Sequence, residues 1–269
     1  LMFKKYPSIN HATDKEFIEK IIEKHGDCFT CIVQEKIHCA NFSFIWDNES
    51  KTVSYAKRTG LLDDNFYNVD EFINRYTPRI EALGRYHNVS FVLHGELFGG
   101  YYPNIKTKEG VTVIQKGVDY TNNHEFIPFD VRINDQLVTF IEFRNFIDDC
   151  FNDVPMIKIC SFARALEISE NFESKVYEYF NLPKTEKNWA EGLVIRPYEN
   201  LWVGRDRVIV KKVAEQFKEK QSRPRRKKSQ KKKTDMTLYQ DKIFIIEDYI
   251  NTNRINSAIS KIGPNDKSL

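Results

Sequence analysis

The residue types best suited to chemistry gather in one short stretch, residues 35–41 (EKIHCAN). It places an amine, an imidazole and an amide between two apolar runs, residues 28–33 and 42–46, that predict strands. Burial between such strands would lower the pKa of Lys36, because a medium of low polarity disfavours the charged ammonium. A lysine with a lowered pKa can act as a nucleophile. Taken alone, Lys36 fits a solvated residue on a hairpin better, since charged side chains are seldom fully buried.

Further along the chain, charged and amide side chains recur at the ends of predicted strands. In one cleft, lysines and an arginine would neutralise phosphate oxygens, carboxylates would hold Mg²⁺ directly or through water, and an amine would attack phosphorus. The P-loop pattern GxxxxGK[ST] is not in the sequence. We therefore predict phosphoryl chemistry of another kind. The strand-end residues concerned are Lys36, His38, Asn41, Arg58, Glu96, Asp130, Glu191, Lys211 and Lys212.

The elements that must position these residues follow from hydrophobic periodicity. Helical spacing is expected over residues 15–22, 69–86, 141–151 and 169–180, with Asp14 as the first N-cap. Strands are expected over residues 52–56, 89–94, 125–133, 189–197 and 207–212. Pro128 inside one of them implies an edge or a bulge. The pattern predicts an α+β domain of twisted antiparallel sheets with helices outside.

Charge is distributed unevenly over the 269 residues, whose net charge is +3. Residues 211–233 hold twelve Lys and Arg against two acids, so the rest of the chain is acidic overall. We expect a domain over residues 1–217, a basic linker over 218–235 and a helical segment over 236–269. The basic run is typical of a solvated linker, and an arm that follows a polyanionic partner is the alternative.

Five cysteines, an odd number, and an N-terminus without a signal-peptide core predict reduced thiols inside a cell. No apolar run approaches the roughly 20 residues of a membrane span. We expect an intracellular monomer, in either cytoplasm or nucleus, that does not enter a membrane.

Six segments in chain order resemble the motifs of the RNA ligase 2 family, which includes the RNA-editing ligases of the covalent nucleotidyltransferase superfamily. Residues 2–6 (MFKKY) and segments within 253–263 are also similar to family segments. The resemblance therefore covers nearly the whole chain. The six motif-like segments are 35–41 (EKIHxxN), 56–60 (AKRTG), 95–100 (GExFxG), 129–130 (FD), 190–197 (AEGxVxRP) and 210–211 (VK).

This resemblance implies a nucleotidyltransferase fold with an ATP-grasp-like ligase cleft, followed by a helical C-terminal domain. It implies that Lys36 attacks the α-phosphate of ATP and forms lysyl-AMP. The AMP would pass to the 5′-phosphate of an RNA, and a 3′-OH would displace it and seal the strand. Nicks in duplex RNA would be the substrate, with Mg²⁺ or Mn²⁺ as the metal.

The resemblance also implies a role for each matching residue. His38 would act near the phosphates, Phe129 would stack on the adenine, and Lys211 would contact the α-phosphate. The implied catalytic residues are Lys36, His38, Glu191, Lys211 and Lys212. The implied nucleotide-binding residues are Glu35, Lys36, Ile37, Asn41, Arg58, Glu96, Phe129, Val194 and Lys211. The implied metal ligands are Glu96 and Glu191.

Three positions depart from the family pattern. Cys39 stands where glycine is usual, which predicts about 1–3 kcal/mol of strain if the backbone there has positive φ. The family's Lys-x-Lys reads Lys211-Lys212 here, and a shift of one residue in a strand turns a side chain to the other face. Arg196 replaces a common lysine, which keeps the charge but changes the geometry.

Two other functions remain compatible with the residues. A capping guanylyltransferase or a DNA ligase would use similar chemistry, but those enzymes commonly carry aspartate where this chain has His38. A non-catalytic RNA-binding relative is the second alternative, and it is suggested by Cys39 and by Val213 in place of the usual lysine.

Overall fold

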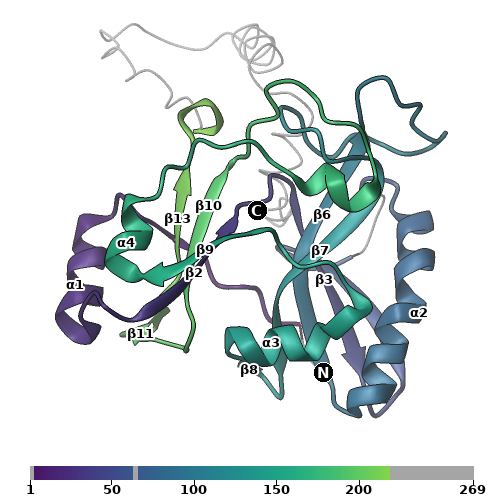
Figure 1. Cartoon of the computed structure of the whole chain (residues 1–269). Coiled ribbons are helices and arrows are strands. Elements are labelled where there is room, and N and C mark those ends of the chain that lie inside the picture. The colour runs from purple at the N-terminus through teal and green to yellow at the C-terminus, as the bar shows by residue number, and fades with distance from the viewer. Residues whose placement is uncertain (1–2, 63–65, 219–269) are drawn as a thin grey trace, which may run out of the picture.

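Two mainly antiparallel sheets and a few helices form the part of the chain that the computed structural model describes, residues 3–62 and 66–218 (Figure 1). This arrangement confirms the predicted α+β class. The predicted helical segment 236–269, and all but the first residue of the predicted linker 218–235, lie outside the described residues. Among the helices of the described part, none is long and apolar enough to cross a membrane.

The strands form a five-stranded sheet, a six-stranded sheet and a separate hairpin. The five-stranded sheet has the order β1 (Asn10–His11), β13 (Val210–Val213), β10 (Gly192–Pro197), β2 (Thr30–Glu35), β9 (Met156–Ser161). The six-stranded sheet has the order β5 (Gly60–Leu61), β4 (Thr52–Lys57), β3 (Ala40–Asp47), β6 (Phe91–Tyr101), β7 (Thr121–Ile133), β8 (Gln136–Leu137). The hairpin pairs β11 (Trp202–Val203) with β12 (Asp206–Arg207). Within the two sheets, β1 and β13 are parallel and the other neighbours are antiparallel.

The helices match the predicted positions in three of four cases. The helices are α1 (Lys15–His25), α2 (Asp70–His87), α3 (Phe140–Ile147) and α4 (Phe162–Glu167), with 3₁₀ turns at Asp148–Cys150, Val176–Phe180 and Glu215–Phe217. The Asp14 side chain accepts from the Phe17 N–H, as predicted. The predicted helix over 169–180 is wrong, because the backbone N–H of Ser174 donates to the carbonyl of Asn188 at 2.7 Å instead of to its own turn.

One face of each sheet is covered by helices, and the two sheets have separate cores beneath them. Phe42, Phe44 and Trp46 of β3 form one core with residues of α2 and α3. The approach of α2 is close, since a Cβ on Gly84 would lie 2.3 Å from the Trp46 ring. A second core joins α1 and α4 to β2, β10 and β13. The opposite faces of the two sheets are therefore left to position polar groups.

The candidate stretch lies where the chain passes between the sheets. β2 belongs to the five-stranded sheet and β3 to the six-stranded sheet, so residues 36–39 are a crossover and not the turn of a hairpin. The backbone N–H of Lys36 still donates to the carbonyl of Gly192 at 2.8 Å, which ties the crossover to β10. Lys36 is thus placed beside both sheets by the topology itself.

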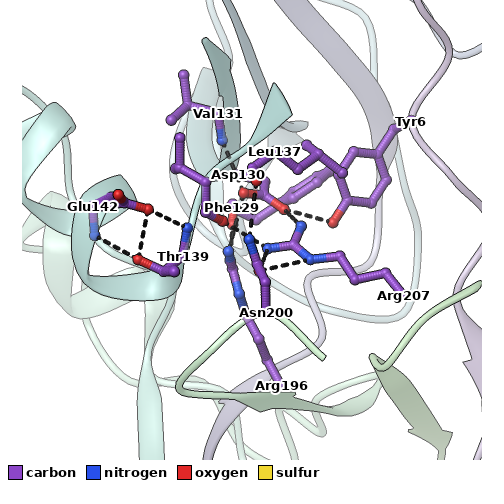
Figure 2. Close-up of polar contacts among 11 residues, drawn as sticks. Tyr6, Phe129, Asp130, Val131, Leu137, Thr139, Glu142, Arg196, Asn200 and Arg207 are labelled. Carbon is purple, nitrogen blue, oxygen red and sulfur yellow. Dashed lines mark hydrogen bonds and ion pairs between the residues drawn. The ribbon is translucent and has the colours of Figure 1, made fainter. Parts of the chain in front are cut away.

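A buried ion cluster joins the sheets (Figure 2). Asp130 of β7 has no exposed surface and accepts from Arg196 of β10 at 3.0 Å and Arg207 of β12 at 2.5 Å. The Tyr6 hydroxyl donates to the same carboxylate at 2.9 Å. The second guanidinium nitrogen of Arg196 donates to the carbonyl of Phe129 at 2.8 Å. This cluster also lies beside a register shift between β6 and β7, as expected for a strand containing Pro128.

Candidate active site

Three of the predicted catalytic residues meet at one carboxylate. Oε2 of Glu191, just before β10, lies 2.7 Å from Nζ of Lys36 and 3.2 Å from Nδ1 of His38. Burial favours the neutral form of this carboxyl, but Lys36 and His38 outweigh burial and lower the pKa of Glu191 to about 2. Glu191 is therefore an anion that holds both the amine and the imidazole.

The prediction that burial lowers the pKa of Lys36 is wrong. Burial does disfavour the ammonium, but the carboxylates of Glu191 and Glu96 outweigh burial and raise the pKa of Lys36. The sequence could not show this, because both carboxylates come from distant parts of the chain. Lys36 is thus stored as an ammonium ion and has to lose a proton before it can attack.

Cys39 fits into the crossover without the strain that its position suggested. It is not among the residues of the described chain that have positive φ. Its thiol donates to Oε2 of Glu96 at 3.3 Å. Burial raises the pKa of Glu96 to about 7, although Lys36 acts in the opposite direction. Cys39 therefore adds a hydrogen-bond donor beside the carboxyl group.

The predicted nucleotide-binding residues come from both sheets. Asn41 of β3 is paired with Glu96 of β6. The next residue, Leu97, belongs to the core beneath α2, so the side chain of Glu96 points to the opposite face of the sheet. Arg58, after β4, donates to the Ser8 hydroxyl at 3.2 Å and acts electrostatically on Glu96. Their roles stay predictions, but the structure brings these side chains to one region.

Apolar residues and Lys211, the predicted phosphate contact, come from the same region. Ile37 is buried in a small core against which Phe129 packs, and the Phe129 ring meets Tyr6 edge-on with centroids 5.0 Å apart. Val194 of β10 and Lys211 of β13 are paired in register. Both alternate with residues of the core under α1 and α4, so they lie on the opposite face of the five-stranded sheet.

Lys212 is not brought to the site. Its ammonium donates to the carbonyls of Leu166 and Ile168 at the end of α4, at 3.1 and 2.5 Å, and pairs with Glu170 at 3.2 Å. The one-residue shift has turned this lysine to the helix-covered face, and no bulge reverses the turn. The structure therefore corrects the catalytic role predicted for Lys212.

Glu35 is buried at the end of β2, beside Ser174 and Lys175. It is paired with Leu193, whose side chain belongs to the core under α1 and α4. Burial raises the pKa of Glu35 to about 7, against the hydrogen bonds from Ser174 and the backbone of Lys175. Its Oε1 has no hydrogen-bond partner. The role predicted for Glu35 in nucleotide binding stays a prediction, and the Glu35 charge acts on the hydroxyl of Tyr120, which contacts His38.

The carboxyl group of Glu35 predicts a pH-dependent stability. Its pKa is higher in the folded than in the unfolded chain, so the stability that it contributes is present below about pH 4.5 and lost as the pH rises through 7. Between pH 5 and 8 the wild-type protein should lose up to about 3 kcal/mol of folding free energy through this carboxyl group. The Glu35→Gln variant should not show this loss. Urea unfolding at both pH values measures this, with exposed Glu109→Gln as the control. An unchanged pH dependence would contradict the assignment.

Asp130 was predicted as a polar group of a cleft, and the structure corrects this. Asp130 and Arg196 are ion-pair partners. They are buried in the cluster that joins the sheets, with side-chain exposures of 0% and 5%. Burial opposes the charge of Asp130, but the two guanidinium groups keep its pKa below the ordinary value. Asp130 is therefore occupied by protein cations and is not a metal ligand.

Sequence reasoning missed two residues that contact His38. The hydroxyl of Tyr120 accepts from the His38 backbone N–H at 2.9 Å. The ring of Phe217 meets the imidazole edge-on, with centroids 5.1 Å apart. Tyr120 lies in a segment that reads as an ordinary loop, and no motif pattern marks it.

The carboxylates of Glu96 and Glu191 suit a divalent metal. They are hard oxygen donors, both act electrostatically on Lys36, and the charge of Glu191 contributes to raising the pKa of Glu96. The described residues contain no cluster of three or more His, Cys, Asp or Glu able to hold a metal alone. A cation here would therefore take its other ligands from water and from phosphates, as Mg²⁺ usually does.

Solved structures of Naegleria gruberi RNA ligase variants share this fold. A variant without ligand is 17% identical with a TM-score of 0.55 and matches 79% of this chain and 56% of its own. One with AMP and Mn is 16% identical with a TM-score of 0.57 and matches 80% and 57%. One with ATP and Mn is 14% identical with a TM-score of 0.55 and matches 80% and 59%. This chain thus spans a little over half the length of those proteins, and identity this low establishes the fold alone.

The sequence itself identifies the family. The family model for RNA ligases matches residues 29–213. This range begins just before β2 and ends with β13, so it contains Lys36, Glu96, Glu191 and Lys211 together with the sheets that position them. Since the match covers more than half of the sequence, the chain belongs to the RNA ligase family.

Proposed function

We propose that this protein is an ATP-dependent RNA ligase that works through a covalent lysyl-AMP on Lys36. The observation that carries the proposal is the position of the Lys36 amine, 2.7 Å from Glu191 and under the influence of Glu96, where the two sheets meet. Membership of the RNA ligase family supports it. So do the related RNA ligase structures that contain ATP or AMP with Mn.

In the first step, Nζ of Lys36 loses a proton to solvent and attacks the α-phosphorus of ATP. A phosphorus–nitrogen bond forms, the bond from the α-phosphorus to the bridging oxygen breaks, and pyrophosphate leaves. Lys211 and His38 would face the phosphates, while Phe129, Ile37 and Val194 would enclose the adenine and Asn41, Arg58 and Glu96 the ribose. Mg²⁺ or Mn²⁺, held by Glu96 and Glu191, would supply neutralisation of phosphate charge.

The next two steps concern the RNA. A 5′-phosphate oxygen attacks the AMP phosphorus, the phosphorus–nitrogen bond breaks, and the amine of Lys36 regains a proton. A 3′-OH then attacks the 5′-phosphate, forms the phosphodiester and releases AMP, with its proton passing to solvent. We propose nicks in duplex RNA as the substrate and a monomer as the working unit.

Intact-protein mass measurement after incubation with ATP and Mg²⁺ tests this proposal. One added AMP is expected, and GTP in a parallel incubation should give no adduct. An adduct formed only with GTP would favour a capping-type enzyme. RNA binding without any adduct would favour a non-catalytic relative and contradict the proposal. Comparing sealing of nicked duplex and single-stranded RNA then tests the substrate.

A further inference from the structure

The crossover that carries Lys36 is held at His38 by a residue outside every motif. Tyr120 has no exposed surface, and its hydroxyl accepts the backbone N–H of His38 at 2.9 Å. Its ring meets Phe98 edge-on, with centroids 5.2 Å apart, within the core that also contains Ile37. Packing therefore fixes the Tyr120 hydroxyl, which holds the chain at His38, two residues after Lys36.

The backbone that carries Tyr120 is itself fixed. The preceding residue, Asp119, exchanges two hydrogen bonds with the side chain of Asn188, one through its N–H and one through its carbonyl, both at 2.8 Å. Asn188 is only 3% exposed. On the other side, Thr121 begins β7. Tyr120 thus has little freedom to follow His38 if the crossover moves.

The side chain of His38 is held from other directions. Nδ1 lies 3.2 Å from Glu191, and the ring contacts Phe217. The Phe217 ring lies near Gly117, where a Cβ would be 3.6 Å away, in the segment that leads to Tyr120. The three contacts hold His38 through its backbone and through its ring.

We propose that Tyr120 is a positioning residue for the attack of Lys36. Its hydroxyl holds the crossover so that the amine and Glu191 keep their geometry, and reacting atoms must be held closely for fast group transfer. Without the hydroxyl, the N–H of His38 loses its acceptor, and the crossover would move to reach another one. This inference rests on the proposed function, because it concerns the rate of lysine adenylation.

Tyr120→Phe, which keeps the ring and removes only the hydroxyl, tests the proposal through two separate rates. One is single-turnover transfer of labelled AMP from ATP to Lys36. The other is sealing, without ATP, of a nick whose 5′ end already carries AMP, a reaction in which Lys36 is not the nucleophile. We expect adenylation to slow about tenfold and sealing to change less than about twofold.

Tyr76→Phe is the matched control. Tyr76 is 4% exposed and its hydroxyl donates to Glu125 at 2.6 Å, in the core beneath α2. We expect this variant to lower the melting temperature and leave both rates unchanged. An unchanged adenylation rate in Tyr120→Phe, or an equal fall of both rates, would overturn the inference while leaving the proposed function standing. A wild-type protein without an adduct would overturn both.

Discussion

Replacing Lys36 by alanine is expected to abolish the covalent AMP adduct while the protein stays folded. The adduct needs a nitrogen nucleophile, and alanine has none. Folding should survive, because Glu191 keeps its contact with His38 and because Lys36 lies at a crossover and not in a core. Labelled ATP followed by denaturing electrophoresis measures the adduct, and a thermal melt checks the fold.

Two further variants sharpen this prediction. Lys36→Arg retains a positive charge beside Glu191, but a guanidinium stays protonated, so it should also form no adduct. Lys212→Ala should still form the adduct, because Lys212 binds the carbonyls at the end of α4. Adduct on a different lysine in the Lys36→Ala protein would refute the assignment of the nucleophile.

Asp130→Asn is expected to destabilise the protein by about 3–5 kcal/mol. The substitution keeps the shape but removes the charge that compensates two buried guanidinium groups, and an uncompensated buried charge is costly. Urea unfolding measures the loss. Asp135→Asn is the matched control, since Asp135 pairs with Lys4 on the surface and such pairs contribute less than about 1 kcal/mol.

The same cluster explains why Arg196 is not equivalent to the lysine that is common in the family. Its two terminal nitrogens donate in different directions, one to Asp130 and one to the carbonyl of Phe129. A single ammonium on a flexible stem cannot reproduce this fork.

A loss below about 1 kcal/mol in Asp130→Asn would show that the arginines find other partners and that the cluster does not join the sheets.

The sequence supported the fold class and the order of the site residues because both depend on local patterns. The apolar runs around Lys36 have the length and composition of buried strands, and α1 carries its own cap. The predicted helix over 169–180 failed because a distant segment takes one of its N–H groups. Local spacing contains no information about such a partner.

Within the site, the sequence could identify residue types but not their electrostatics. The pKa of Lys36 is raised because Glu191 and Glu96 arrive from distant parts of the chain, which reverses the effect expected from burial. The orientation of Lys212 follows from the one-residue shift, since strand alternation is a local rule. Tyr120 could not be foreseen, because its role depends on a single hydrogen bond between remote segments.

The parallel pairing of β1 with β13 has a consequence for biosynthesis. It places His11 beside Lys211, so the first and last strands of the described domain are neighbours. Contacts between such distant parts of a chain form late, because the loop-closure entropy must be overcome first. A nascent chain that has not yet released β13 from the ribosome therefore already carries Lys36 but lacks Lys211, which lies on the strand between β1 and β10. We expect competence to react with a nucleotide to arise only when synthesis has passed the last strand of the sheet.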